Sequence, residues 1–339
     1  MKGCLIAIVV VGVLCFLGLI VFIGLFIAAG TASVTGGALS SDVYHFQEVT
    51  VGGSYGAPKV VCIPVEGVIY GSSMSLAELS PAALITAQLK KAHEDDRVRG
   101  VILLVDSPGG GITASDILYR EVREFRTGTN GRPVVACMMD MGTSGAYYVS
   151  VGTDHIVAHP TAITGSIGVM MPLFDVTGLM NKVGVRSESV TSGAYKDIGS
   201  PFAEKSAEQK RKERELLQSI VDAMHQRFVE VVAQGRKMEQ EDVKALADGR
   251  IFTAQEALDL KLIDQIGYES DAVDAMKRLA GLKEVHLVQY RRILTMSDIF
   301  NTFAKGPELN VNVGQGLPAL EGGRLMYLWT LPSSQDVTR

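Results

Sequence analysis

The chain has 339 residues and a formal net charge of −5, which gives no basic footprint for nucleic-acid binding. Hydrophobic residues make up 47% of it and the mean hydropathy is +0.21, but much of this excess lies at the N-terminus. The rest has an ordinary globular composition and is long enough for one large domain or two modest ones.

The N-terminal segment is apolar over a length that spans a membrane. No charged residue occurs between Gly3 and Ser41, and Cys4–Ala29 exceeds the ~20 residues that cross a bilayer. We therefore predict an uncleaved transmembrane helix over residues 1–30, because a cleaved secretory signal has an apolar region of only about 7–15 residues. Lys2 is the only flanking cation and weakly favours a cytoplasmic N-terminus. The expectation is a single-pass protein of the cell (inner or plasma) membrane with an extracytoplasmic domain.

The next part of the chain predicts a linker followed by an α/β domain. Residues 31–57 are rich in Gly, Ser, Thr and Val without helical periodicity, which predicts a linker that ends where the domain begins, near Pro58. Apolar runs of strand length then alternate with helical patterns, which predicts crossover units and a parallel sheet. The strand-length runs are Val60–Val65, Gly100–Val105, Pro133–Met138 and His155–Val157, and the helical patterns are Leu76–His93 and Ala114–Arg126.

The second half of the domain is predicted to be mainly helical. The long amphipathic pattern Ala203–Gly235 predicts a helix whose apolar stripe packs on the core or on a neighbouring subunit. Its charged run, Lys205–Arg214, is interpreted as a solvated helix face. Shorter elements are expected as helices at Ala254–Leu260 and Ser270–Leu279 and as a strand at Val285–Tyr290.

The C-terminal part has a weaker pattern. We assign residues 58–292 to the folded domain and residues 293–339 to a tail. Within the tail, Leu325–Leu331 is apolar and holds the only tryptophan, Trp329. We expect this stretch to dock on its own domain or on a neighbouring subunit.

The first motif that could carry chemistry is a glycine-rich turn, Val105-Asp-Ser-Pro-Gly-Gly-Gly111, at the end of an apolar strand. Its backbone N–H groups could hold an anion, either a phosphate or the oxyanion of acyl transfer. A phosphate loop is disfavoured because no Gly-Lys-Ser/Thr follows and the Gly-x-Gly-x-x-Gly spacing is missing. A purely structural turn is the other interpretation.

The second motif places Ser144 among small residues after a predicted strand, in Met141-Gly-Thr-Ser-Gly-Ala-Tyr-Tyr148. Small neighbours let a substrate carbonyl approach a serine hydroxyl, and the N–H of Gly145 would be a candidate oxyanion donor. The structural alternative is a serine that caps a helix.

A serine nucleophile needs a base, and none of the six histidines lies in a persuasive context. The third motif offers a lysine instead, because Gly193–Phe202 places Lys196 amid glycine, serine, proline and aromatic residues. A free lysine has a pKa near 10.4, which its surroundings must lower to about 7–8 for it to act as a base. The alternative is a solvated loop lysine.

Together the three motifs resemble the S49 peptidase family, in particular its short members of the signal peptide peptidase A type. The resemblance is carried by Ser144–Tyr148, by the following segment Ala158–Val169, and by the Tyr-Lys-Asp-x-Gly-Ser-Pro-Phe pattern at Tyr195–Phe202. It runs from about Val60 to Asp264, with the N-terminal anchor added. The Ser-Pro-Gly-Gly turn is shared more widely, with Clp proteases and crotonases.

The resemblance implies a ClpP/crotonase-like fold, a repeated β-β-α superhelix behind an N-terminal transmembrane helix. It assigns Ser144 as nucleophile and Lys196 as general base. It also assigns backbone N–H groups as oxyanion donors, namely those of Gly145 and Gly110, with Gly109 and Gly111 as alternatives in the turn.

The resemblance further implies a Ser-Lys endopeptidase with no metal and no cofactor. Its expected substrates are hydrophobic peptides, chiefly signal peptides already released from preproteins. Members form ring-like or dome-like homo-oligomers in which the serine and the lysine can come from adjacent subunits. Ala146 replaces the second glycine of the usual Ser-Gly-Gly-Tyr-Tyr pattern, and we expect its methyl group to narrow the pocket slightly.

Two other classes of function are weighed against this one. An acyl-CoA enzyme of the crotonase type would share the sheet and the glycine turn. It predicts a soluble chain with acidic catalytic residues, against which the anchor and the lysine motif count. An inactive scaffold of the same fold is disfavoured because every catalytic position holds a competent residue type.

Overall fold

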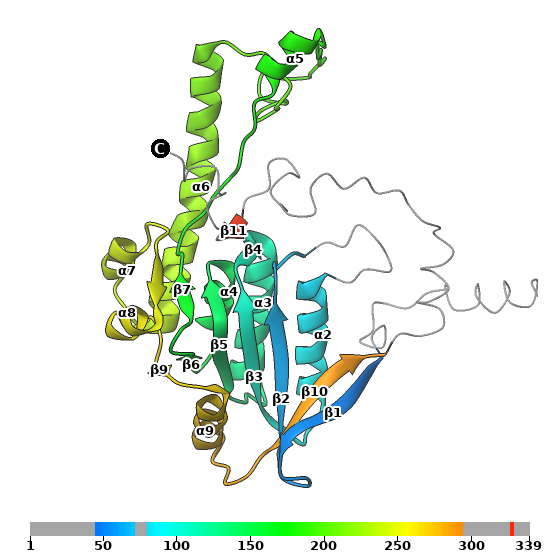
Figure 1. Cartoon of the computed structure of the whole chain (residues 1–339), viewed down its shortest axis with the longest axis vertical. Helices are drawn as coiled ribbons and strands as arrows, with labels where there is room; N and C mark the ends of the chain where they lie inside the picture. The colour runs from blue at the N-terminus through cyan, green and yellow to red at the C-terminus, as the bar shows by residue number, and fades with distance from the viewer. Residues whose placement is uncertain (1–44, 72–79, 294–325, 329–339) are drawn as a thin grey trace, which may run out of the picture. The chain divides into compact units, whose positions relative to one another are not determined.

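The computed structural model describes residues 45–71, 80–293 and 326–328. The predicted transmembrane segment, residues 1–30, and the first part of the predicted linker lie outside the described residues. Within the described ranges, no helix is long and apolar enough to cross a membrane. The described chain forms a mixed α/β fold (Figure 1).

The described elements alternate strands and helices in the first half of the domain. The strands are β1 (Phe46–Gly53), β2 (Lys59–Glu66), β3 (Val98–Ser107), β4 (Gly109–Gly111), β5 (Val134–Thr143), β6 (His155–Ala158), β7 (Ile163–Gly165), β8 (Ile251–Thr253), β9 (Gln265–Ile266), β10 (His286–Arg292) and β11 (Met326–Leu328). The helices are α2 (Pro81–Glu94), α3 (Ile112–Thr127), α4 (Gly145–Ser150), α5 (Thr177–Val183), α6 (Ala207–Arg236), α7 (Gln240–Leu246), α8 (Ala254–Asp259) and α9 (Glu269–Ala280).

The main sheet has the strand order β1-β10-β2-β3-β5-β6-β9. Every neighbouring pair from β10 to β9 is parallel, with α2 and α3 in the connections around β3. The predicted parallel sheet with helical crossovers is therefore confirmed. The predicted strand runs became β2, β3, β5, β6 and β10, and the predicted helices became α2, α3, α6, α8 and α9.

Both faces of the sheet are covered, and side chains alternate between them. On one face Val61 and Leu103 join a core with α2, α3 and α4, while on the other Cys62 and Ile102 pack with α9. Strands buried on both faces read as continuous apolar runs, because neither set of alternating side chains meets water. This is why the central strands could be located in the sequence.

The predicted linker is wrong for its last part, because residues 46–53 form β1. This strand pairs antiparallel with β10, from Phe46 opposite Arg292 to Gly53 opposite His286. Thr50 Oγ1 also lies 2.8 Å from His286 Nε2, which adds a side-chain contact to the ladder. The strand is half-exposed at the sheet edge and its partner is distant in the sequence, so the local pattern gave no apolar run to recognise.

Helix α6 extends from the domain into a projecting arm, which consists of α5, the loop between α5 and α6, and the N-terminal part of α6 (Figure 1). Its C-terminal third packs on α4, where Phe228 is fully buried and its ring centroid lies 5.1 Å from that of Tyr148. Farther towards the N-terminus of α6, Leu216 and Ile220 of the predicted apolar stripe are exposed. Figure 1 shows α5 beside the outer end of α6. The predicted packing of the stripe on the core therefore holds only for its last part.

The C-terminal tail contributes β11, which pairs antiparallel with β4 of the same chain. Tyr327 stands opposite Gly110 in this ladder. The predicted docking stretch, Leu325–Leu331, is described only at these three strand residues, and the remainder of the tail lies outside the described residues.

Candidate active site

Ser144 lies at the turn between β5 and α4. Ser144 is 1% exposed. Its backbone has φ 54° and ψ −117°, and residues other than glycine rarely adopt a positive φ. Its N–H donates to the carbonyl of Gly165 over 2.8 Å, which holds the turn against β7. A strand-to-helix turn of this kind presents a serine hydroxyl from a rigid backbone.

The helix that follows Ser144 is fixed by the two tyrosines of the motif. Tyr147 is buried and its hydroxyl donates to the carbonyl of Leu262 over 2.8 Å, and burial raises the pKa of that phenol. Tyr148 donates to Asp116 of α3 over 2.5 Å. Ala146 is fully buried within the core, so its methyl group packs inside the domain. The expected narrowing of the substrate pocket by this methyl group stays a prediction.

The glycine turn forms β4, which lies against α4. Two of its three N–H groups are already used, since Gly109 donates to Ser107 Oγ over 3.1 Å and Gly111 donates to the Ile69 carbonyl over 2.7 Å. Because backbone groups alternate along a strand, the N–H of Gly110 points away from Ile69, to the side on which β11 pairs. Among the three candidate glycines, Gly110 therefore has the N–H directed away from these two bonds, and in the single chain it faces the paired strand β11.

Lys196 lies in a loop of overlapping turns between α5 and α6. The N–H of Lys196 donates to the Gly193 carbonyl over 3.1 Å, and the N–H of Ser200 donates to the Asp197 carbonyl over 3.0 Å. The Lys196 side chain is exposed and forms no hydrogen bond with another described residue. The loop is thus defined in its backbone, while the amine at its tip faces solvent in the single chain.

A partly buried ionic cluster next to Lys196 was missed by the sequence analysis. Lys205 Nζ donates to the Asp197 carbonyl over 2.8 Å, lies 3.2 Å from Asp197 Oδ1, and also donates to Glu213 of α6. Burial works to lower the pKa of Lys205, but its hydrogen bonds to Glu213 and Asp197 and their negative charges outweigh it and raise that pKa. Lys205 therefore stays protonated and is unsuited to act as the base.

The single chain does not bring Lys196 and Ser144 together. The loop of Lys196 is bound to α6 at Glu213, whereas α4 is bound near Arg227, which donates to the same Asp116 carboxylate as Tyr148 over 3.3 Å. At 1.5 Å per residue, these two points on α6 are about 21 Å apart along the helix axis. No hydrogen bond joins Lys196 to Ser144 in the described part of the chain.

The histidines closest in sequence to Ser144 have partners elsewhere. The His155 ring contacts Gln265 at 3.4 Å, and the His159 ring contacts Thr161 at 2.8 Å. Neither forms a hydrogen bond with Ser144 among the described residues; His155 opens β6 and His159 directly follows it.

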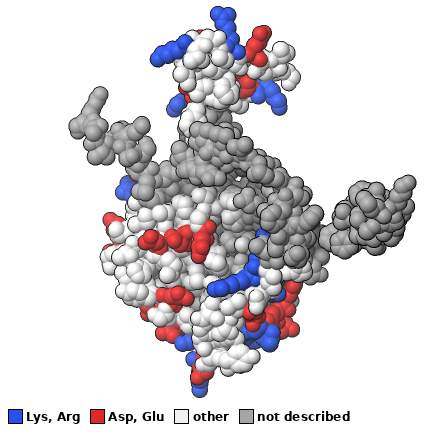
Figure 2. Space-filling model, turned by 45° about the vertical axis from the view of Figure 1, so that its right-hand side comes forward, with Lys and Arg blue, Asp and Glu red and all other residues white. Residues whose placement is uncertain are grey.

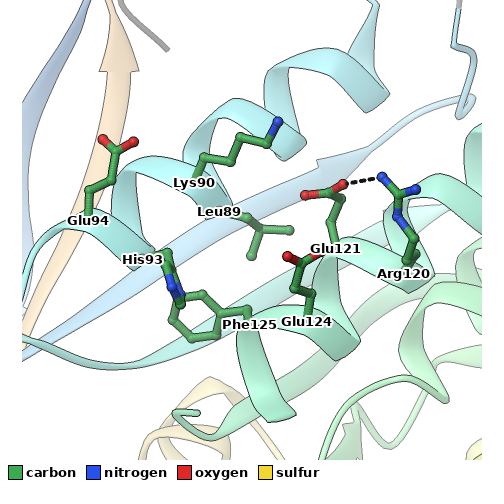
Figure 3. A pocket seen from close by; sticks show the side chains of 8 residues that line it. All are labelled: Leu89, Lys90, His93, Glu94, Arg120, Glu121, Glu124 and Phe125. Atoms are coloured by element: carbon green, nitrogen blue, oxygen red, sulfur yellow. Dashed lines mark hydrogen bonds and ion pairs between the residues drawn. The ribbon is translucent and has the colours of Figure 1, made fainter. Parts of the chain in front are cut away.

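A surface cleft lies between α2 and α3 (Figure 3). It has a volume of about 340 Å³ and is lined by Leu89, Lys90, His93, Glu94, Arg120, Glu121, Glu124 and Phe125. Glu121 pairs with Arg120 at 2.9 Å, and the His93 ring packs edge-on against Phe125. Its charged groups are thus paired or solvated, and the cleft holds no serine or cysteine nucleophile.

The described surface carries charged side chains of both signs. On the face drawn in Figure 2, acidic and basic side chains are interspersed over the described part. No group of three or more potential metal ligands occurs among the described residues.

Comparison with known proteins gives consistent similarities. The profile of peptidase family S49 matches residues 126–283. The chain is 38% identical over 240 residues to an Enterococcus faecium protein with the provisional name signal peptide peptidase SppA, covering 70% of this chain and 68% of the relative. It is 36% identical over 242 residues to a provisionally named protease of Methanocaldococcus jannaschii, covering 71% and 76%.

Among solved structures, a mutant of ClpP1 from Listeria monocytogenes aligns with 62% of this chain and 94% of its own chain, with 12% identity and a TM-score of 0.41. This similarity carries no argument about topology. The described structure establishes the mixed α/β fold, and the repeated β-β-α superhelix stays a prediction.

Proposed function

Because the chain belongs to peptidase family S49 and is a serine protease, we propose that it is a membrane-anchored endopeptidase with a Ser144–Lys196 dyad. Its proposed substrates are hydrophobic peptides such as released signal peptides. The observation that carries this proposal is the strained turn at Ser144, which presents a serine beside the glycine strand β4.

The proposed cycle is acyl transfer in two steps. Neutral Lys196 takes the proton of the Ser144 hydroxyl as its Oγ attacks the peptide carbonyl, and the N–H groups of Gly145 and Gly110 stabilise the oxyanion. The protonated lysine then gives this proton to the leaving amine, which frees the first product. Water activated by the same lysine hydrolyses the serine ester and releases the second product.

The dyad is proposed to be completed between adjacent subunits of a homo-oligomer. Lys196 is exposed in the single chain, and its loop is bound to α6 about 21 Å along the helix from the point where α4 is bound. The same arm carries exposed apolar side chains, including Leu179, Val183 and Val190. An arm that packs on a neighbour would bury these side chains and desolvate Lys196, which lowers the pKa of an amine.

The membrane location is also proposed, from the apolar segment over residues 1–30. A domain held outside the cytoplasm at the membrane would meet hydrophobic peptides where they are released. The provisional name of the Enterococcus faecium relative supports signal peptides as the substrate class. An added protease tests this location in membrane vesicles of the two orientations. The domain should be digested in right-side-out vesicles and protected in inverted ones. Digestion in inverted vesicles only would contradict the proposal.

The experiment that tests the function is hydrolysis of a hydrophobic fluorogenic peptide by the full chain in detergent. Ser144→Ala and Lys196→Ala should each lose at least about 10³-fold in kcat while remaining folded. Lys182→Ala, which removes another exposed lysine of the same arm, is the matched control and should keep full activity. Full activity in Lys196→Ala would mean that the base is a different group.

A further inference from the structure

The partly buried cluster of Lys205, Asp197 and Glu213 has no role in the chemistry described above, yet it lies directly beside the Lys196 loop. Its side chains are 9%, 27% and 11% exposed, in an arm whose other side chains are mostly exposed. Removing charged groups from water is unfavourable unless they are paired and hydrogen-bonded. Such a cluster defines one backbone arrangement, because a shifted loop would leave buried charges unpaired.

The contacts of Lys205 are aimed at the main chain that follows Lys196. Its Nζ binds the Asp197 carbonyl at 2.8 Å and the Asp197 carboxylate at 3.2 Å, while its bond to Glu213 ties both to α6. Glu213 is the only buried residue of α6 before Phe228, so this is where the helix meets the loop. The Asp197 carbonyl also accepts the N–H of Ser200 over 3.0 Å, which closes the last turn of the loop.

We propose that Lys205 is a positioning residue for the reaction, because it fixes the main chain of Asp197, the residue after Lys196, on the rigid surface of α6. This inference rests on the proposed role of Lys196 as the base. Lys205 touches neither substrate nor Ser144. It acts by holding the loop so that the Lys196 amine is presented at a constant place, which matters because a misplacement of about 1 Å can lower a rate about 100-fold.

The test compares three variants of the full chain. Lys205→Met removes the ammonium and keeps the length of the side chain, and Lys205→Arg restores a cation that can bind both carboxylates. Lys212→Met is the matched control on the same helix, because Lys212 is exposed and pairs only with Glu208 within α6. Peptide hydrolysis gives kcat and KM, and hydrogen exchange by mass spectrometry reports on the amides of Lys196–Ser200.

We expect kcat to fall about 100-fold in Lys205→Met with KM within about 3-fold of the wild type, since the groups around Ser144 are untouched. Lys205→Arg should recover to within about 10-fold, and Lys212→Met should match the wild type. The amides of the Lys196 loop should exchange at least about 10-fold faster in Lys205→Met and at the wild-type rate in Lys212→Met.

Wild-type kcat and unchanged loop exchange in Lys205→Met would overturn the inference, and so would an equal loss of kcat in Lys212→Met. If Lys205→Met does not fold, Glu213→Gln, which keeps the side-chain volume, carries the same expectations and decides. Failure of the proposed function is a different result: the wild type would not cleave, or Ser144→Ala would cleave fully. The exchange measurement does not depend on cleavage, so it still decides whether Lys205 fixes the loop.

Discussion

Gly110→Ala should disable the enzyme, whereas Gly111→Ala, the same change one residue later, should be tolerated. A Cβ on Gly110 would lie 1.9 Å from the Ile69 carbonyl oxygen and 2.7 Å from the Ile69 nitrogen. Real Cβ contacts stay above 3.0 Å, so backbone atoms would have to separate by more than 1 Å. A Cβ on Gly111 would meet nothing closer than 3.8 Å.

The size of the effect follows from the oxyanion role that we propose for the Gly110 N–H. Loss of one oxyanion donor lowers kcat by about 10²–10³-fold, and we expect a loss in this range for Gly110→Ala and less than about 3-fold for Gly111→Ala. Peptide hydrolysis by the two full-length variants is the assay, with circular dichroism to show that both are folded. Equal losses in the two variants, or a fully active Gly110→Ala, would refute the assignment of Gly110.

Two further predictions concern the framework around Ser144. Tyr148→Phe removes the 2.5 Å hydrogen bond to Asp116 and should lower the free energy of unfolding by about 1 kcal/mol, because the carboxylate is half-exposed and can be hydrated. Thermal unfolding should therefore show a Tm that is lower by about 3 °C, and an unchanged Tm would contradict this. Asp264→Asn breaks a two-bond ion pair with Arg236, at 2.8 and 2.9 Å, and should lower the free energy of unfolding by about 1.5 kcal/mol at pH 7, because the carboxylate is partly hydrated. Burial works to raise the pKa of Asp264, but Arg236 outweighs it and lowers that pKa. The carboxylate therefore stabilises the fold fully above the unfolded pKa of about 3.9, and this stabilisation is lost as the pH falls through the lower folded pKa. The difference between wild type and Asp264→Asn in urea unfolding should therefore shrink below about pH 4, and a difference independent of pH would contradict the ion pair.

The central sheet could be predicted because its strands are buried on both faces. Runs such as those of β2 and β3 stay apolar throughout, and turn residues separate them from helices with a clear stripe. Strand β1 could not be found in this way, since it is half-exposed and its partner β10 lies more than 200 residues later. Strand β4 consists only of glycines, whose pairing with β11 and Ile69 depends entirely on tertiary structure.

The residues of the candidate site were more visible in the sequence than their arrangement. Ser144 and Lys196 could be named from small-residue and lysine motifs. No local pattern predicts that the points on α6 that hold α4 and the Lys196 loop are about 21 Å apart along the helix axis. Lys205 and Glu213 lie in a charged run that was interpreted as a solvated helix face. Their pairing could not be predicted, because it depends on the Asp197 loop folding back onto α6. Sequence periodicity reports which face of a helix is apolar, and it cannot report a buried ion pair between a loop and that helix.

The central claim is that Ser144 of one subunit works with Lys196 of another, and complementation tests it most directly. Full-length Ser144→Ala and Lys196→Ala chains, each inactive alone, are mixed in equal amounts, dissociated and reassembled, and peptide hydrolysis is measured. In a random assembly about one quarter of the sites would combine an intact serine with an intact lysine from the neighbour, so about 25% of wild-type activity should return. If mixed oligomers form and no activity returns, the dyad is not shared between subunits and the account is contradicted.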